Sequence, residues 1–225
     1  MCILTFVETK DSKIITFTRD EDPDRNFENM KLRSNGLICP LDLQNKGTWI
    51  GCNGLQISML QNGALEKHKR KSHYDKSRGL ILMEILNGKK IDEVFDELKG
   101  MEIEPFTLSI FEIKDSLFTI YTYDGENSIK KINDESNSLI NLSSTLYDNS
   151  SKIRIKNDFI KAALSEPDDL IDFHLKYKIN QVNGISHPLV CSTSITQFVV
   201  TYSTINYKFI NLLSNQIIVG KSDII

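Results

Sequence analysis

The chain has 225 residues, of which 40% are hydrophobic and 25% are charged, and its formal net charge is −3. These values are typical of a globular protein and exclude a disordered or fibrous chain. A chain of this length buries about 70% of the surface that it exposes when unfolded. We therefore predict a single domain over residues 1–225 that needs no disulfide or structural metal to complete its core.

The start of the chain, MCILTFVETKDSK, has no basic segment, and its apolar run ends at Glu8. This run is too short for a signal peptide or a membrane span, so we expect a cytoplasmic protein without a membrane-spanning segment. The mildly acidic pI of about 5.8 argues against nucleic acid as a partner. The four cysteines have no close spacing, so no metal site is predicted and the thiols are expected to be reduced.

The first half of the chain predicts two hairpins separated by a long connection. Residues 2–7 and 13–18 are rich in β-forming side chains and predict the first hairpin. Residues 20–48 contain Pro23 and Pro40 and are predicted to be irregular. Residues 49–60 predict two short strands hinged at Asn53-Gly54, a strong hairpin signal.

Helices and strands then alternate in blocks. Apolar residues at helical spacing predict helices over 77–86, 90–101, 153–164 and 166–176. Strands are predicted over 106–113, 117–123, 196–201, 207–213 and 216–219, whereas the polar stretch 133–151 is predicted to be loop. This order favours an α+β layered fold with antiparallel sheets over alternating βαβ units.

The first hairpin brings reactive groups together at its open end. With Lys10-Asp11 as the two loop residues, Cys2 lies opposite Arg19. The face of the hairpin that carries this pair is almost wholly apolar until its open end, where the thiol meets the guanidinium. If a cellular aminopeptidase removes Met1, Cys2 carries both a thiol and an α-amine, a nucleophile and a base on one residue.

Charges beside Cys2 would tune these two groups. An α-amine has an unperturbed pKa of roughly 7.7 to 8.0, and the positive charge of Arg19 favours both a neutral amine and a thiolate. Asp20 and Glu21 are placed to hold Arg19 or the ammonium through charge-assisted hydrogen bonds. The alternative is that Cys2 is only a buried thiol at a sheet edge, since free cysteine is among the most buried residue types.

Five short blocks in order resemble the NRDE, or transport-and-Golgi-organisation protein 2, family. They are MCI at the start, TRDE at 18–21, GTWIG at 47–51, LQN at 60–62 and SRG at 77–79. The resemblance implies an N-terminal-nucleophile hydrolase fold, an αββα sandwich of two antiparallel sheets between helix layers. It also implies Cys2 as the nucleophile, Arg19 and Asp20 as its electrostatic partners, and Asn62 as a donor to an oxyanion.

The chain departs from the family pattern at two places. Leu142-Ser143-Ser144 stands where the family shows Leu-Ser-Asn, and Ser192-Thr193-Ser194 stands where it shows Arg-Thr-x-Thr. Ser144 thus replaces an amide donor, and Ser192 replaces a guanidinium. By this resemblance, the fold is retained while hydrolysis is altered or absent.

Outside the hairpin, Trp49 and Arg78 are the candidate ligand-binding residues. Trp49, the only tryptophan, is expected in the core or in a pocket wall. Arg78 begins a predicted helix and is the best anion-binding candidate of the basic stretch 67–78, which is otherwise expected to be a solvated loop. The histidines have no partners at metal spacing.

Three hypotheses for the function remain open. The first is a hydrolase of linear amide or acyl substrates that acts through a Cys2 thioester and needs no cofactor. The second is a non-catalytic carrier of haem or of an acylated metabolite, since relatives in the family are linked to haem trafficking and Cys39-Pro40 has a form seen in haem-responsive proteins. The third is a scaffold that binds partners through the basic stretch. The sequence does not fix the oligomeric state.

Overall fold

The computed structural model describes residues 2–133, 136–145, 147–180 and 190–224. Met1 and His187 lie outside these ranges. The chain divides into two compact units, one formed by Met1–Arg25 with Glu135–Ile224 and the other by Asn26–Asp134. The first unit therefore combines the two ends of the chain, and the second unit is inserted between them.

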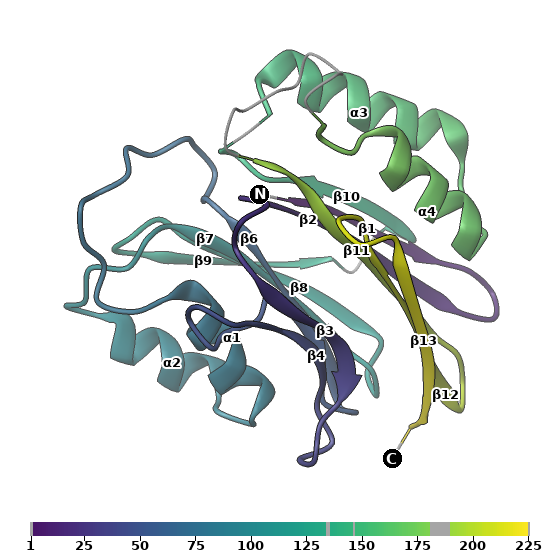
Figure 1. Ribbon diagram of the computed structural model, residues 1–225, viewed down its shortest axis with the longest axis horizontal. Helices are drawn as coiled ribbons and strands as arrows, with labels where there is room; N and C mark the ends of the chain where they lie inside the picture. Colours follow the sequence, from purple (N-terminus) through teal and green to yellow (C-terminus); the bar gives the residue numbers. More distant parts are fainter. Residues whose placement is uncertain (1, 134–135, 146, 181–189, 225) are drawn as a thin grey trace. The chain divides into compact units, whose positions relative to one another are not determined.

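The first unit is built on an antiparallel sheet. Among the described residues this sheet has six strands in the order β10-β1-β2-β11-β12-β13 (Figure 1). Their bounds are β1 Cys2–Glu8, β2 Lys13–Glu21, β10 Ser138–Leu142, β11 Cys191–Val200, β12 Thr204–Asn211 and β13 Gln216–Asp223. The two-residue loop between β1 and β2 is closed by a bond from the Thr9 N–H to the Ser12 carbonyl, which confirms the predicted register.

Two helices cover one face of this sheet, α3 (Asn149–Ala162) and α4 (Pro167–Lys176) (Figure 1). Asp148 caps the start of α3 by accepting from the Ser151 N–H, and Pro167 occupies the first turn of α4. The core between sheet and helices contains, among others, Ile3, Val7, Ile14, Leu142, Tyr147, Ile155, Phe159, Leu170, Phe173 and Tyr177. The two predicted helices are confirmed, although α3 begins four residues earlier than expected.

The second unit is also a sheet with two helices. Its described strands run in sequence order, β3 Phe27–Leu32, β4 Ile38–Asp42, β5 Ile50–Cys52, β6 Gln56–Asn62, β7 Phe106–Glu112, β8 Leu117–Tyr123 and β9 Ser128–Asn133. The helices α1 (Arg78–Leu86) and α2 (Ile91–Leu98) pack on one face, with a core that includes Leu60, Ile81, Leu82, Ile85, Phe106, Leu108, Ile110 and Tyr121. The predicted helices and the Asn53-Gly54 hinge are confirmed.

Two stretches that were predicted to be irregular contain strands. Residues 20–48 include the hairpin β3–β4, although Pro40 lies within β4. The register shifts between Glu28 and Lys31 on β3, opposite Pro40, so the missing proline N–H coincides with a bulge. Residues 138–142 form β10, which pairs with β1 despite its polar flanks. Both predictions were wrong because local composition does not show which neighbouring strand completes the pairing.

None of the helices in the described ranges is long and apolar enough to cross a membrane.

A buried histidine fastens α4 to the β1–β2 hairpin. His174 is fully buried; its Nε2 lies 2.9 Å from Thr5 Oγ1 and its Nδ1 lies 2.7 Å from Thr18 Oγ1. Burial lowers the pKa of this imidazole to about 3, so the folded protein holds it neutral. His174 therefore has a structural role in this unit.

The neutral His174 ring makes stability depend on pH. The stabilisation is fully present above the unfolded pKa of about 6.5 and is lost as pH falls toward 3, because the unfolded chain takes up the proton first. We expect the difference in unfolding free energy between the native chain and a His174→Gln variant to shrink by about 1.4 kcal/mol per pH unit between pH 6 and 4. Urea denaturation at each pH measures this difference, and a constant difference would contradict the assignment.

Gly47 and Gly79 make a close backbone contact in the second unit. A Cβ built on Gly47 would lie 2.5 Å from the carbonyl carbon of Gly79, and one built on Gly79 would lie 3.1 Å from the Thr48 oxygen. The Thr48 N–H also donates to the Gly79 carbonyl at 3.1 Å. The start of α1 can therefore approach the segment before β5 only when neither position carries a side chain.

This contact makes a second stability prediction. Gly47→Ala forces backbone to move and is expected to cost about 3 kcal/mol of unfolding free energy, near the upper end of overpacking effects. Gly79→Ala, with the longer contact, should cost less. Urea unfolding of both variants gives the comparison, and equally small losses would show that the two segments separate easily.

Candidate active site

The open end of the β1–β2 hairpin carries Cys2 and Arg19 as direct partners across the two strands. Cys2 is 3% exposed and Arg19 is 4% exposed. The strand pleat puts both residues on the sheet face opposite α4, together with Leu4 and Phe17. The structure thus confirms the predicted pairing of the thiol with the guanidinium-bearing residue.

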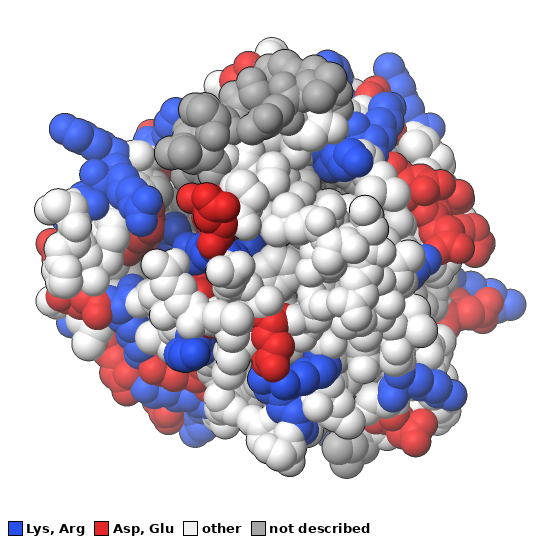
Figure 2. Space-filling view, in the orientation of Figure 1, with Lys and Arg blue, Asp and Glu red and all other residues white. Residues whose placement is uncertain are grey.

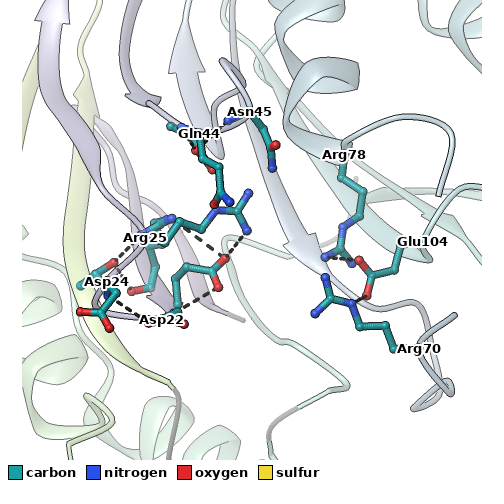
Figure 3. A network of polar contacts seen from close by, with 12 residues as sticks. Asp22, Asp24, Arg25, Gln44, Asn45, Arg70, Arg78 and Glu104 are labelled. Carbon is teal, nitrogen blue, oxygen red and sulfur yellow. Dashed lines mark hydrogen bonds and ion pairs between the residues drawn. The ribbon is translucent and has the colours of Figure 1, made fainter. Parts of the chain in front are cut away.

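The Arg19 guanidinium is held by neighbours in the same unit. Its Nη1 donates to Thr193 Oγ1 at 3.0 Å, and its Nη2 lies 4.0 Å from the Glu21 carboxylate. Arg25 Nη1 also contacts Glu21, at 3.2 Å. In Figure 3 the turn after β2 carries Asp22, Asp24 and Arg25. The Arg19 charge is therefore balanced by Glu21 and fixed by a hydroxyl from β11.

Thr193 was not predicted as a site residue. The register between β2 and β11 shifts between Ser192 and Ser194, so Thr193 sits in a bulge. From there its hydroxyl accepts from Arg19 and lies 3.3 Å from the Arg19 carbonyl oxygen. A bulge depends on the pairing of distant strands, so no local sequence signal could have identified it.

Asp20 is a buried carboxylate with a hydrogen bond on each oxygen. Ser192 Oγ donates to Oδ1 at 2.5 Å, and the Tyr147 hydroxyl donates to Oδ2 at 3.4 Å. Burial raises the pKa of Asp20 to about 6, against the lowering effect of these two hydroxyls and of Arg19. Asp20 is thus ionised at neutral pH, and it titrates in a range where a proton can be exchanged.

The Cys2 thiol is held in its neutral form. Burial raises its pKa, and the negative charge of Asp20 raises it further, whereas the backbone N–H of Asp20 donates to the sulfur and lowers it. Desolvation therefore outweighs the contacts that favour a thiolate, in agreement with the alternative expectation of a buried thiol. The thiol therefore needs a base before it can act as a nucleophile.

The two segments that depart from the family pattern contact the open end of the β1–β2 hairpin. The Ser143 N–H donates to the Cys2 carbonyl at 3.1 Å, and Ser144 is 8% exposed in the turn that follows β10. Ser192 pairs with Asp20 across β2 and β11. Both segments thus lie next to the hairpin end.

Asn62, Trp49 and Arg78 belong to the second unit, and the expected role of Asn62 at the Cys2 site stays a prediction. Asn62 ends β6 and pairs with Phe106. The Trp49 ring is 7% exposed and packs edge-on against Phe27, with ring centroids 5.4 Å apart. Its position is compatible with the core role that was one of its two expected roles.

The basic stretch is extensively ion-paired within the second unit. Arg78 contacts Glu104 at 2.8 Å and donates to the Pro105 carbonyl at 3.0 Å, and Arg70 approaches the same carboxylate at 3.8 Å. Figure 3 shows Arg70 and Arg78 on either side of Glu104. On the face of the molecule in Figure 2, basic and acidic side chains are interspersed. An anion at Arg78 would have to compete with Glu104.

Comparison with known proteins identifies both a family and a fold. The model of the family described as Transport and Golgi organisation 2 matches residues 1–204. No match to a curated protein was found.

Solved structures of two hydrolases are similar to this chain. A mutant of conjugated bile acid hydrolase from Clostridium perfringens is 11% identical, with a TM-score of 0.57, covering 99% of this chain and 97% of that one. Penicillin V acylase from Agrobacterium tumefaciens is 10% identical, with a TM-score of 0.56, covering 97% of this chain and 85% of that one. At this identity the likeness shows the fold alone, and it is the predicted α+β N-terminal-nucleophile hydrolase fold.

The raised pKa of Cys2 can be tested in protein that retains Met1. Because the thiolate is the reactive form, alkylation of Cys2 by iodoacetamide should be slower at pH 7 than that of free cysteine, whose pKa is about 8.5, and should keep rising above pH 9. Peptide mapping by mass spectrometry follows the reaction residue by residue. A rate that levels off below pH 8 would mean that the thiolate is already formed.

Proposed function

Because the chain belongs to the Transport and Golgi organisation 2 family, we propose that it is a hydrolase of linear amide or acyl substrates, with Cys2 as the nucleophile after removal of Met1. The observation that carries this proposal is the cluster at the hairpin end, where Cys2 pairs with Arg19 and receives the Asp20 N–H. The fold shared with a bile acid hydrolase and a penicillin acylase supports it.

The neutral thiol fits a mechanism in which the same residue supplies the base. Removal of Met1 would give Cys2 an α-amine with a pKa near 8, a base that is partly neutral at cellular pH. This amine takes the thiol proton while the sulfur attacks the substrate carbonyl carbon. The resulting ammonium then gives the proton to the leaving nitrogen, the C–N bond breaks, and a thioester remains on Cys2.

Water completes the cycle by the same route in reverse. The α-amine accepts a proton from water as its oxygen attacks the thioester carbonyl, and the C–S bond breaks to release a carboxylic acid and restore the thiol. Asp20, ionised at neutral pH, is suited to accept a hydrogen bond from the ammonium. Asn62 is proposed as the amide donor to the oxyanion, a contribution worth about 2.7 to 4 kcal/mol in related chemistry.

A second candidate is a non-catalytic carrier of haem or an acylated metabolite. The observation that favours it is the loss of two polar side chains of the family pattern, an amide and a guanidinium. Ser144 stands in place of the amide, and Ser192, in place of the guanidinium, bonds to Asp20. In that case the residues around Cys2 are retained from a catalytic ancestor but do not catalyse hydrolysis.

One set of variants separates the two candidates. Intact-mass analysis first establishes whether Met1 is removed, and conjugated bile acids and penicillin V then serve as probe amides. If the hydrolase proposal holds, Cys2→Ala lowers kcat/KM by at least about 10³-fold, because the covalent step is lost. Cys191→Ser, which changes a half-buried cysteine on the same sheet, should leave turnover near that of the native chain.

The outcomes are distinct. Retained Met1, or turnover that persists in Cys2→Ala, would rule out the proposed mechanism. A Soret shift on haem titration that survives Cys2→Ala, with no turnover of either amide, would favour the carrier.

A further inference from the structure

Asp20 is fixed from two directions by groups that lie far from it in the sequence. Its carboxylate is 1% exposed. Ser192, on the neighbouring strand β11, donates to one oxygen, and Tyr147, in the segment before α3, donates to the other. Burial without such donors favours the neutral form of a carboxyl group, so these two hydroxyls orient the carboxylate and favour its charged form.

The Ser192 hydroxyl has its direction set by the backbone. Its oxygen accepts from the Ile179 N–H at 2.8 Å, and the Ser192 N–H donates to the Ile179 carbonyl at 3.0 Å. Since this oxygen already accepts from Ile179, its single proton is directed at Asp20. Ser192 therefore acts as a fixed donor, in the position where the family pattern has a guanidinium.

The Tyr147 hydroxyl is the weaker of the two donors. Its ring is 3% exposed and packs in the core of the first unit with Leu142 and Ile155. Burial raises the pKa of this phenol well above its usual value, and the charge of Asp20 adds to the effect. Tyr147 thus stays protonated and remains a donor, but its contact with Asp20 is 3.4 Å, longer than that of Ser192.

Asp20 in turn acts on the Cys2 sulfur through its charge and its backbone N–H. The other titratable or charged groups around Asp20 are Arg19 on its own strand, Tyr147, Cys191 on β11 and the amine at the start of the chain. The hydroxyl groups of Ser192 and Tyr147 each donate a hydrogen bond to the carboxylate.

We propose that Ser192 and Tyr147 are positioning residues of the Cys2 site, which hold the Asp20 carboxylate in place and ionised beside the sulfur. This inference rests on the proposed function for its biological meaning, but the arrangement itself is testable without a substrate. The Ser192 hydroxyl, which is held by the Ile179 backbone, and the Tyr147 hydroxyl orient the Asp20 carboxylate. Ser192 does so at the position where the family pattern has an arginine.

The direct test is the titration of Asp20. Its midpoint, followed by carbon-13 NMR of the labelled carboxyl and assigned with Asp20→Asn, should lie near 6 in the native chain. Loss of a hydrogen bond to a charged group should raise it by about 1 to 2 pH units in Ser192→Ala. Tyr147→Phe, which keeps the ring and loses the longer contact, should raise it by less.

Tyr177→Phe is the matched control. Tyr177 belongs to the same core and its hydroxyl also bonds a carboxylate, Asp158, which joins α4 to α3 away from Cys2. Its removal should leave the Asp20 midpoint unchanged. Thermal melting of each variant checks that the fold is retained, and because Tyr147→Phe leaves the Ile179 bonds intact, it remains informative if Ser192→Ala is unstable.

A second measurement links the arrangement to Cys2. Between pH 6 and 7, where a larger share of Asp20 is neutral in Tyr147→Phe than in the native chain, alkylation of Cys2 should be faster in the variant because the opposing charge is reduced. In an Asp20→Asn background, Tyr147→Phe should change nothing further.

An Asp20 midpoint that stays in place in both Ser192→Ala and Tyr147→Phe would overturn the proposal. So would a Cys2 profile that responds equally to Tyr177→Phe, or that responds to Tyr147→Phe without Asp20. Absence of amide turnover in the native chain would count against the proposed hydrolase function and leave the test of these positioning residues unaffected.

Discussion

The pairing of β1 with β2 is the constraint on which the candidate site depends. The loop of Lys10 and Asp11 fixes the register, and the strand pleat then assigns every residue of the hairpin to one face or the other. Cys2 and Arg19 point to one face, while Thr5 and Thr18 point to the other and hold His174. A slip by one residue would exchange the two sets, so one local choice decides both the anchoring of α4 and the location of the thiol.

The polar cluster around this hairpin balances desolvation against hydrogen bonding. Asp20 and Arg19 are both buried, and burying a charge without partners costs several kcal/mol. The partners come from both ends of the chain: Tyr147 precedes α3, and Ser192 and Thr193 lie on β11. The first unit can therefore form its polar cluster only after its two sequence segments have met. The same burial that makes these contacts strong keeps the Cys2 thiol neutral.

The sequence was sufficient to predict those elements whose structure depends on neighbouring residues in the chain. The first hairpin, the turn at Asn53-Gly54 and the four helices follow from side-chain alternation, turn residues and helical spacing. It was insufficient where a distant strand decides, as for β10, a short strand with polar flanks that pairs with β1, and for β4, whose Pro40 lies opposite a bulge in its neighbour. Tyr147 and Thr193 escaped notice for the same reason. For Cys2, the sequence left open both a thiolate favoured by the charge of Arg19 and a buried thiol, because it does not show how strongly the sulfur is desolvated.

The contact between Gly47 and Gly79 changes what the family blocks mean. Each glycine belongs to a different block, GTWIG and SRG, yet the two blocks touch through bare backbone and cannot vary independently. The two glycines meet one packing requirement of the fold, and this requirement is independent of catalysis. A member of the family could lose every catalytic group and still need both glycines for packing. These two blocks therefore indicate family membership and do not indicate activity.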